Sequence, residues 1–258
     1  MFLGTFNDLI TSEEANLTAQ EFFRNKLRAV VKDPLTAEQL MPDFNLGCKR
    51  LIVGTDYYET YNRENVSLVS IKDSGIDEIA SGGIVVGAEQ YDCDVIVLAT
   101  GFDAITGPIM AIDITGRNGT AIRDKWKDGP SCYLGLMPEG FPNLFTITGP
   151  GSPSILSNVI KSIEQHVDFI ADCIARVREN GDEVVEATAE AEAAWVSHVD
   201  EIATETVFKS CNSWYLGSNI PGKPQVFTGY VGWPEYAAEL DDIVKDNYRG
   251  FRIGKAGA

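Results

Sequence analysis

The sequence has few basic residues and an excess of acidic ones. Its 258 residues include 21 lysines and arginines against 38 aspartates and glutamates, which gives a formal net charge of −17. Nucleic acid is therefore an unsuitable partner, because phosphate binding needs clustered lysine and arginine. The same negative charge disfavours attraction of the protein to anionic membrane surfaces. We expect the acidic side chains on solvated helix faces, where they keep the protein in solution.

Histidine is nearly absent as well. His166 and His198 are the only two, and both lie in helical patterns among acidic residues. We expect each to be a surface or packing residue rather than a catalytic base or a metal ligand. No GxSxG, HExxH or P-loop spacing occurs. Hydrolase and metalloenzyme functions are therefore poorly supported, and no metal site is predicted.

Cysteines are few and scattered, at Cys48, Cys93, Cys132, Cys173 and Cys211, and no two form a CxxC pair. This pattern is typical of reduced thiols in a cytosolic protein, so neither a disulfide framework nor a zinc site is predicted. No apolar run approaches membrane-spanning length, and the N-terminus has no signal-peptide pattern. With an apolar fraction of 44%, the chain is expected to be a globular, cytoplasmic protein.

The most informative segment that is present is the apolar run Val95–Leu98, which ends in Ala99-Thr100-Gly101. A run without alternation predicts a strand buried on both faces, in a parallel sheet covered by helices. Ligands of such α/β sheets lie at the carboxyl ends of the strands, where small residues let a cofactor approach the backbone. The run therefore suggests a strand that leads to a dinucleotide. The alternative is an ordinary core strand followed by a glycine turn.

Hydrophobic periodicity predicts the remaining elements. Helices are expected over 13–33, 35–40, from about 154 to Gly181, from Thr188 to about 206, and over 233–248, and a short aromatic helix or turn over 56–62. Strands are expected over 51–53, 66–71, 76–79, 84–86, 143–148 and 226–227. In the long helix, the apolar stripe is assigned to Ile160, Ile163, Val167, Ile170 and Ile174.

Three further segments are candidate binding elements. The small residues Gly149–Ser154 precede the long helix and could present free N–H groups to an anion; the alternative is a plain capping turn. Lys49-Arg50 is a basic pair in an acidic chain that could bind a phosphate or another anion, or could be an ordinary surface pair. Trp214 lies in a loop and could contact a ligand or only pack there.

Together these segments resemble the Baeyer–Villiger flavin monooxygenase family, of the phenylacetone and cyclohexanone monooxygenase type. The matching segments, in family order, are CKRL at 48–51, YYETYNRENV at 57–66, DVIVLATGFDA at 94–104, DITGR at 113–117, GP at 129–130, YLG at 133–135, GFPNLF at 140–145, GPGSPS at 149–154, SIEQHV at 162–167, SWY at 213–215 and NIPGKP at 219–224. The resemblance extends over essentially the whole chain.

The resemblance implies only half of such an enzyme. The family carries two GxGxxG dinucleotide fingerprints with a signature between them, and this chain has none of these. The implied fold class is α/β, with Rossmann-like FAD and NADPH domains whose N-terminal halves are missing. Residues 1–42 would be the end of a helical insertion, 43–102 the second lobe of the NADPH-binding domain, and 103–258 the C-terminal part of the FAD-binding domain. The missing N-terminal half is then the expected partner.

Family roles transfer to matching positions. Arg50 matches the arginine beside the flavin that stabilises the anionic peroxyflavin, which attacks a ketone and yields an ester or lactone. Lys49 matches the lysine that contacts the 2′-phosphate of NADPH, and Trp214 matches a tryptophan that hydrogen-bonds the nicotinamide nucleotide. Thr100 and Gly101 are expected close to cofactor.

The start of the long helix is implied to lie near the flavin ring. Asn158 and Val159 are expected to contact the cofactor; relatives often carry Met at position 159, but a backbone N–H contact would survive that change. The substrate-pocket residues implied by the match are Ser154, Ile155 and Leu156. Trp233 replaces a glycine common in relatives, which puts local packing in doubt.

The implied enzyme is an FAD- and NADPH-dependent monooxygenase that acts on a small ketone and O2, and the fragment is expected to be inactive alone. A related flavin monooxygenase that oxidises sulfur or nitrogen is an alternative. A third hypothesis is a non-catalytic acidic binding module that reuses half of the fold.

Overall fold

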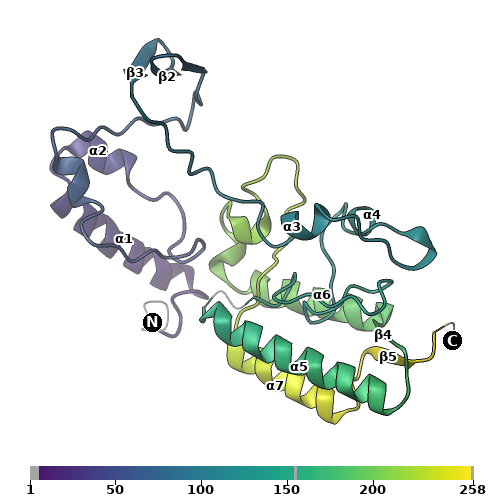
Figure 1. Cartoon of the computed structure of the whole chain (residues 1–258). Coiled ribbons are helices and arrows are strands. Elements are labelled where there is room, and N and C mark those ends of the chain that lie inside the picture. Colours follow the sequence, from purple (N-terminus) through teal and green to yellow (C-terminus); the bar gives the residue numbers. More distant parts are fainter. Residues whose placement is uncertain (1–5, 154–155, 257–258) are drawn as a thin grey trace. The chain divides into compact units, whose positions relative to one another are not determined.

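A computed structural model describes residues 6–153 and 156–256 (Figure 1). The chain divides into two compact units. The large unit comprises Met1–Asn16, Phe44–Leu51 and Asp103–Ala258, and the small unit comprises Leu17–Asp43 and Ile52–Phe102. The chain contains both helices and strands, and to that extent it agrees with the predicted α/β class. The predicted domain bounds at residues 42 and 102 stay a prediction.

Two helices at the start of the chain form where local signals predict them. In α1 (Glu13–Val30), the Ser12 Oγ accepts a hydrogen bond from the Ala15 N–H at 3.3 Å, and two glutamates occupy the first turn. In α2 (Pro34–Gln39), the Asp33 carboxylate accepts from the Thr36 N–H at 2.8 Å. Leu27, Val31 and Ala37 form the core of the small unit, against Phe23, Leu40, Met41 and Tyr58. The short aromatic helix is η2 (Glu59–Asn62).

The small unit also contains a three-stranded antiparallel sheet. Its strands β1 (Glu78–Ala80), β2 (Gly83–Val86) and β3 (Glu89–Asp92) pair in sequence order, with Ile79 opposite Ile84. The predicted hairpin over 76–86 is therefore confirmed. The third strand, β3, was not expected as a partner of β2.

The predicted buried strand at Val95–Leu98 is wrong for the chain as described. This segment is not a strand, and its side chains are exposed, Val97 by 82% and Leu98 by 74%. A strand that is buried on both faces needs paired neighbours and covering helices. Within the described residues both sheets are antiparallel, and neither includes this segment. The strands expected at 51–53 and 66–71 are absent for the same reason.

The large unit is built on three helices and a two-stranded sheet. Helices α5 (Val159–Glu179) and α7 (Trp233–Lys245) run side by side (Figure 1), and α6 (Ala189–Thr204) begins at Thr188, whose Oγ1 accepts from the Ala191 N–H at 3.2 Å. The strands β4 (Val184–Ala187) and β5 (Phe251–Gly254) pair antiparallel and were not predicted. Short elements complete the unit: α3 (Gly107–Met110), η3 (Arg117–Gly119), α4 (Ile122–Lys125), η4 (Val207–Lys209) and η5 (Trp214–Leu216).

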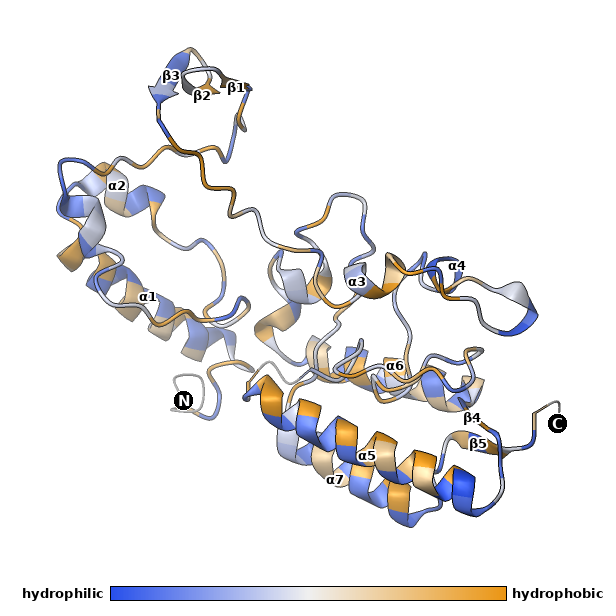
Figure 2. Ribbon diagram, viewed as in Figure 1, coloured by the Kyte–Doolittle hydropathy of each residue, from blue (hydrophilic) through white to orange (hydrophobic). Residues whose placement is uncertain are grey.

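The buried face of α5 differs from the stripe that the sequence suggested. Figure 2 shows hydrophobic residues recurring along α5 with hydrophilic ones between them. The side chains that α5 buries belong to Ser162, His166, Phe169, Cys173 and Val177. Three residues of the predicted stripe are instead exposed: Ile160 by 57%, Val167 by 46% and Ile174 by 44%. Of the predicted stripe, Ile170 packs against the core of the unit.

Two further strand predictions, at 143–148 and 226–227, are wrong. Asn143 and Thr148 have positive φ values of 61° and 52°, which interrupt an extended chain. The segment still lies along its neighbours, since the Asn143 N–H donates to the Val185 carbonyl at 2.9 Å and the Thr146 N–H to the Leu136 carbonyl at 2.7 Å. Residues 226–227 are likewise not a strand.

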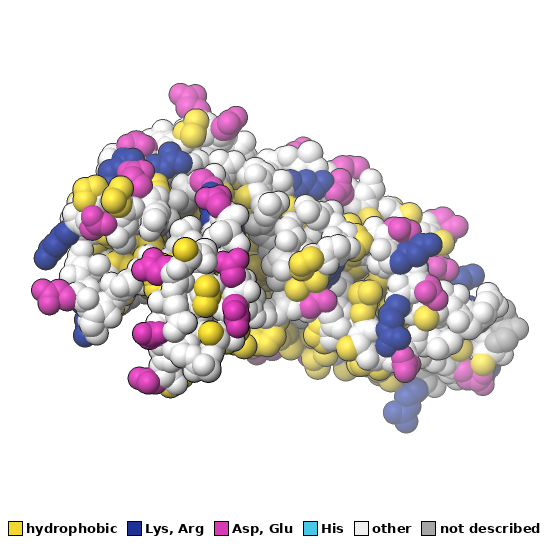
Figure 3. Space-filling view, turned by 90° about the horizontal axis from the view of Figure 1, so that it is seen from above, with side chains coloured by type: hydrophobic (Ala, Val, Ile, Leu, Met, Phe, Trp, Pro, Cys, Tyr) yellow, Lys and Arg dark blue, Asp and Glu magenta, His cyan; other side chains and the backbone are white. Residues whose placement is uncertain are grey.

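Surface charge and hydropathy complete the description. On the face drawn in Figure 3, basic and acidic side chains are interspersed, with hydrophobic side chains between them. Among the helices of the described residues, none is long and apolar enough to cross a membrane. A cytoplasmic location stays a prediction from the sequence.

Candidate functional site

The segment Phe44–Leu51, which carries the basic pair, is fixed to the large unit by specific hydrogen bonds. The fully buried Asn16 amide donates to the Leu46 carbonyl at 2.8 Å, and its Oδ1 accepts from the Leu46 N–H at 2.9 Å. The Asn45 amide donates to the Ser210 Oγ at 2.9 Å. The segment therefore lies beside residues that precede the Trp214 loop.

A disulfide makes the same connection covalently. Cys48 and Cys211, 163 residues apart in sequence, are bonded with an S–S distance of 2.10 Å. The prediction of five reduced thiols is therefore wrong for this pair; Cys93, Cys132 and Cys173 are free. Count and spacing could not reveal the pair, because disulfide connectivity depends on which distant segments fold together. In the sequence, Cys48 directly precedes Lys49 and Cys211 lies three residues before Trp214.

The two basic side chains differ in their surroundings. The Lys49 ammonium lies 4.3 Å from the centroid of the Phe44 ring, a cation–π contact. Arg50 is exposed and makes no hydrogen bond or ion pair with any residue that the structure describes. Burial raises the pKa of Tyr215, and the positive charge of Arg50 opposes that rise. The Cys48–Cys211 bond joins the segment of Arg50 to the residues before the Trp214 loop, and the guanidinium keeps its donors available for an anion.

The Trp214 loop combines packing with unused polar atoms. Trp214 is half-buried in η5, and its ring centroid lies 4.3 Å from that of Tyr215. Trp214 packs against the core of the large unit, as the alternative to a ligand contact predicted. On either side, the buried Ser213 Oγ and Ser218 Oγ have no hydrogen-bond partner within residues 6–153 and 156–256. Buried hydroxyls in native structures are usually paired, so these two are available to a ligand. Sequence reasoning did not identify them.

The far end of the loop is anchored as well. The Lys223 ammonium pairs with the Asp103 carboxylate and donates to the Ala104 carbonyl at 3.3 Å. A cavity of about 340 Å³ lies beside this anchor, and Thr106 and Trp126 contribute to its wall. None of the predicted pocket residues that the structure describes lines this cavity.

The glycine turn before α5 is bound within the chain. The Gly149 N–H donates to the Gly135 carbonyl at 3.1 Å, and the Gly151 N–H to the Thr228 carbonyl at 2.8 Å. The Ser152 Oγ donates to the Gly149 carbonyl at 2.8 Å. A Cβ on Gly135 would lie 2.2 Å from the Ser152 Oγ, so no side chain fits there. These contacts favour the structural interpretation of the turn over a set of free N–H groups.

The residues predicted around the start of α5 are partly described. Asn158 is the N-cap, and its Oδ1 accepts from the Ile160 N–H at 3.0 Å. Val159 is half-buried, and Leu156 is exposed by 39%. The predicted pocket residues Ser154 and Ile155 lie outside the described residues.

Thr100 and Gly101 belong to the small unit, whereas the other described site residues belong to the large unit. Both are exposed, and Gly101 has a φ of 86°, a conformation that favours glycine. The structure thus places six predicted site residues in the large unit: Lys49, Arg50, Leu156, Asn158, Val159 and Trp214. The roles given to these residues stay predictions.

Both histidines have packing partners. The buried His166 accepts from the Thr148 N–H at its Nδ1 (3.0 Å), and its Nε2 lies 2.8 Å from the Tyr236 Oη, which donates to the Leu134 carbonyl. Burial lowers the pKa of His166 to about 4. His198 is exposed, and its Nε2 lies 3.0 Å from the Tyr230 Oη. Within the described part of the chain, no group of three His, Cys, Asp or Glu residues could hold a metal ion.

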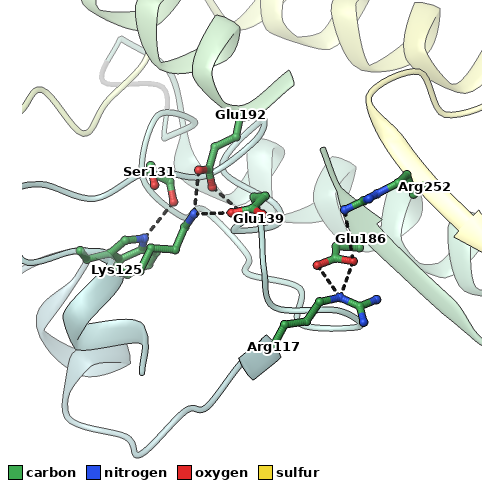
Figure 4. A network of polar contacts seen from close by, with 8 residues as sticks. Arg117, Lys125, Ser131, Glu139, Glu186, Glu192 and Arg252 are labelled. Atoms are coloured by element: carbon green, nitrogen blue, oxygen red, sulfur yellow. Dashed lines mark hydrogen bonds and ion pairs between the residues drawn. The ribbon is translucent and has the colours of Figure 1, made fainter. Parts of the chain in front are cut away.

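Two ion-pair clusters, seen in Figure 4, support the large unit. Lys125 pairs with Glu192 at 2.9 Å and with Glu139 at 3.1 Å, and Glu192 also accepts from the Glu139 N–H at 2.8 Å. Arg117 donates through its Nε to both oxygens of the buried Glu186, at 2.8 and 3.0 Å. Each acid thereby ties a helix or strand to the irregular segment 113–140, a structural role.

Comparisons with known proteins extend over nearly the whole chain. No protein-family model matches. The chain is 42% identical to a Baeyer–Villiger monooxygenase of Pseudooceanicola batsensis, over 95% of this chain and 45% of the relative. It is 40% identical to the cyclohexanone 1,2-monooxygenase of an Acinetobacter species, over 96% of this chain and 46% of the relative. The chain is related to the Baeyer–Villiger monooxygenases.

The solved structures agree with the sequence relatives. An oxidized steroid monooxygenase bound to NADP matches with a TM-score of 0.90 and 43% identity, over 99% of this chain and 48% of that one. The OTEMO complex with FAD and NADP matches with a TM-score of 0.90 and 38% identity, over 96% of this chain and 46% of that one.

Another sequence relative, the phenazine N-monooxygenase of Lysobacter antibioticus, is 40% identical, over 96% of this chain and 46% of the relative. The chain therefore spans about half the length of the curated relatives it matches.

Proposed function

We propose that the chain is the C-terminal half of an FAD- and NADPH-dependent Baeyer–Villiger monooxygenase that converts a ketone to an ester or lactone with O2. The relatives' names and the half-length matches support this proposal. The observation that carries it is the exposed Arg50 guanidinium, which has no ionic or hydrogen-bonded partner among the described residues and whose segment is bonded through Cys48 to Cys211, three residues before Trp214. A permanent cation placed without a counterion is suited to stabilise negative charge during a reaction.

The residues present fit part of a dinucleotide site. Reduced FAD would supply the oxygen-activating chemistry and NADPH the hydride. Lys49 and Arg50 would provide positive charge for phosphate and for the reacting centre, and Trp214 an indole N–H donor. Ser213 and Ser218 would pair their orphaned hydroxyls with the nucleotide. These contributions fit dinucleotide-binding domains whose other halves lie outside this chain.

The other predicted cofactor and substrate contacts are part of the same proposal. Val159 would donate its backbone N–H to the flavin, whereas the Asn158 Oδ1 is already used as the helix cap. Leu156 would face an apolar ketone. Thr100 and Gly101 would let the cofactor approach the backbone, because they lack bulk.

The missing N-terminal half is the proposed partner, because the large unit leaves apolar surface on α5. Ile160, Val167 and Ile174 are spaced seven residues apart and therefore share one face of the helix. Exposed apolar faces of this kind mark surfaces that another element covers. Without that half, we expect the isolated chain to bind no flavin and to oxidise no NADPH.

A chimera tests the function. This chain would replace the matching half of the Acinetobacter cyclohexanone 1,2-monooxygenase, and flavin absorbance, NADPH oxidation and products from cyclohexanone would be measured. We expect a yellow protein that forms lactone, and a loss of roughly a hundred- to thousand-fold in rate for Arg50→Ala. Arg178→Ala, an exposed arginine near the end of α5, is the control. A chimera that binds both cofactors and forms no ester or lactone would refute the proposal.

Oxidation of aromatic nitrogen is the second candidate, favoured by the 40% identity to the phenazine N-monooxygenase. The same chimera, supplied with phenazine and with cyclohexanone in separate reactions, distinguishes the two. N-oxide without lactone would favour this candidate.

A further inference from the structure

We propose that Cys48 and Cys211 form a redox-sensitive clamp that holds the segment carrying Lys49 and Arg50 against the Trp214 loop. The clamp is the disulfide between the two residues, and its position in sequence is what gives it a function. One sulfur belongs to the residue directly before Lys49, and the other to the residue three positions before Trp214. The bond thus joins the two segments to which nucleotide binding is assigned.

The disulfide is a covalent link between the two segments, and a hydrogen bond lies beside it. The Asn45 amide donates to the Ser210 Oγ at 2.9 Å, and this bond is exposed. An exposed neutral hydrogen bond contributes little net stability. The second anchor of the segment, at Asn16, holds it at Leu46, which comes before Cys48 and Arg50 in the sequence. Opening the disulfide would therefore loosen the side that carries Arg50.

Access to the two sulfurs is unequal, which gives the clamp a defined chemistry. Cys48 is fully buried, whereas Cys211 is half-buried. A small thiol can attack the Cys211 sulfur, and the Cys48 thiolate then leaves. In the reverse direction, hydrogen peroxide oxidises the Cys211 thiol to a sulfenic acid and is reduced to water. The Cys48 thiol then forms the S–S bond and displaces a second water. Overall two thiols lose two electrons and two protons, and one peroxide gives two waters.

The proposal depends on the proposed function only for what the held residues bind; the clamp itself is tested without cofactor. Trypsin places each cysteine in its own peptide, with Cys48 in residues 33–49 and Cys211 in residues 210–245. After free thiols are alkylated, a non-reducing digest of the peroxide-treated chain should contain these two peptides linked. The peptides of Cys93, Cys132 and Cys173 should be alkylated.

Hydrogen exchange then measures the clamping. On reduction, amides in 47–51 and 211–218 should exchange at least roughly tenfold faster. This factor is smaller than the full effect that a disulfide has on the equilibrium of local opening. Amides of α5 and α7 should be unchanged. The Cys48→Ala/Cys211→Ala variant should match the reduced chain, and Cys93→Ser should match the oxidised wild type. If that double variant does not fold, reduction of the wild type gives the same comparison.

Two results would overturn the clamp. Five alkylated cysteines after peroxide treatment would show that the bond does not form, and equal exchange in the oxidised and reduced chain would show that the bond holds nothing. Both results would leave the chimera experiment standing, because neither measurement needs flavin or turnover. Conversely, a redox-dependent loop in a chain whose chimera makes no product would support the clamp and refute only the proposed reaction.

Discussion

Lowering the pH should destabilise the large unit through His166. Burial lowers the pKa of this imidazole from 6.5 to about 4, and its two nitrogens are occupied by the Thr148 N–H and the Tyr236 hydroxyl. In the unfolded chain the same histidine binds a proton near pH 6.5. Between pH 6.5 and 4 the unfolded state therefore holds more protons than the folded state. Stability is complete above pH 6.5 and falls as the pH drops toward 4.

The size of the effect follows from the two pKa values. At pH 5 the free energy of unfolding should be lower by about 2 kcal/mol than at pH 7.5, and the loss should reach about 3 kcal/mol below pH 4. A large share of a typical domain's stability is thus at stake, since that stability is only 5–15 kcal/mol. Carboxylates add their own pH dependence, but they are common to the wild type and a histidine variant.

Urea unfolding followed by tryptophan fluorescence measures this effect, because all four tryptophans belong to the large unit. His166→Gln keeps an acceptor and a donor but cannot be protonated, so it should lose about 2 kcal/mol less than the wild type between pH 7.5 and 5. The exposed His198→Gln is the matched control and should behave as the wild type. Equal losses in wild type and His166→Gln, or an NMR titration of His166 with a midpoint near pH 6.5, would refute the reasoning.

Two further predictions concern the large unit. Glu192→Gln leaves the half-buried Lys125 ammonium with one carboxylate partner instead of two. It should cost ~2 kcal/mol of unfolding free energy, between an exposed pair and a broken buried pair. The exposed Glu190→Gln on the same helix should cost under ~1 kcal/mol, and equal costs would contradict the assigned pairing. Phe169→Ala should lower the free energy of unfolding by about 3–5 kcal/mol. The substitution Val167→Lys, at an exposed position, should change stability little and reduce binding of the dye ANS. If urea titrations showed the larger loss for Val167→Lys, the apolar face predicted from the sequence would be the buried one.

Helices could be predicted from sequence because their signals are local. Ser12, Asp33 and Thr188 cap helices within three residues of themselves, and the structure shows the corresponding hydrogen bonds. The antiparallel hairpin around Ser81-Gly82 is local in the same sense. Such elements need no knowledge of distant segments.

Non-local features could not be predicted in the same way. The strands β4 and β5 pair across some 70 residues, as Val184 opposite Gly254 shows, and neither is long enough to give a pattern. In α5, apolar residues lie both on the buried face, as Phe169 does, and on the exposed face, as Val167 does, so periodicity alone does not say which face packs against the core. The Cys48–Cys211 bond is the extreme case, because its two halves are 163 residues apart.

The candidate site shows the same division. Arg50, Lys49 and Trp214 were identified from short matching segments, and the structure brings their two segments together. The orphaned hydroxyls of Ser213 and Ser218 were missed, because a serine's lack of a partner is visible only in three dimensions. For the glycine turn at 149–152 the sequence left two interpretations open, and the structure favours the structural one, since its N–H groups find acceptors in segments far away in sequence.

The exposed strand-like segments have a physical consequence that connects these errors. In the small unit Ile52, Val53, Val95, Val97 and Leu98 are 84, 96, 76, 82 and 74% exposed. Burying one such side chain contributes roughly 1.5–3 kcal/mol, so covering all five would contribute on the order of 10 kcal/mol, comparable with the stability of a whole domain. Exposed apolar surface of this extent marks a site that another element covers. We infer that the apolar pattern of Val95–Leu98 encodes contacts with strands and helices beyond those described, as the half-length match to the relatives also implies. The strand prediction is wrong for the described residues, in which this segment is exposed and belongs to neither sheet, and we propose that the N-terminal half covers it.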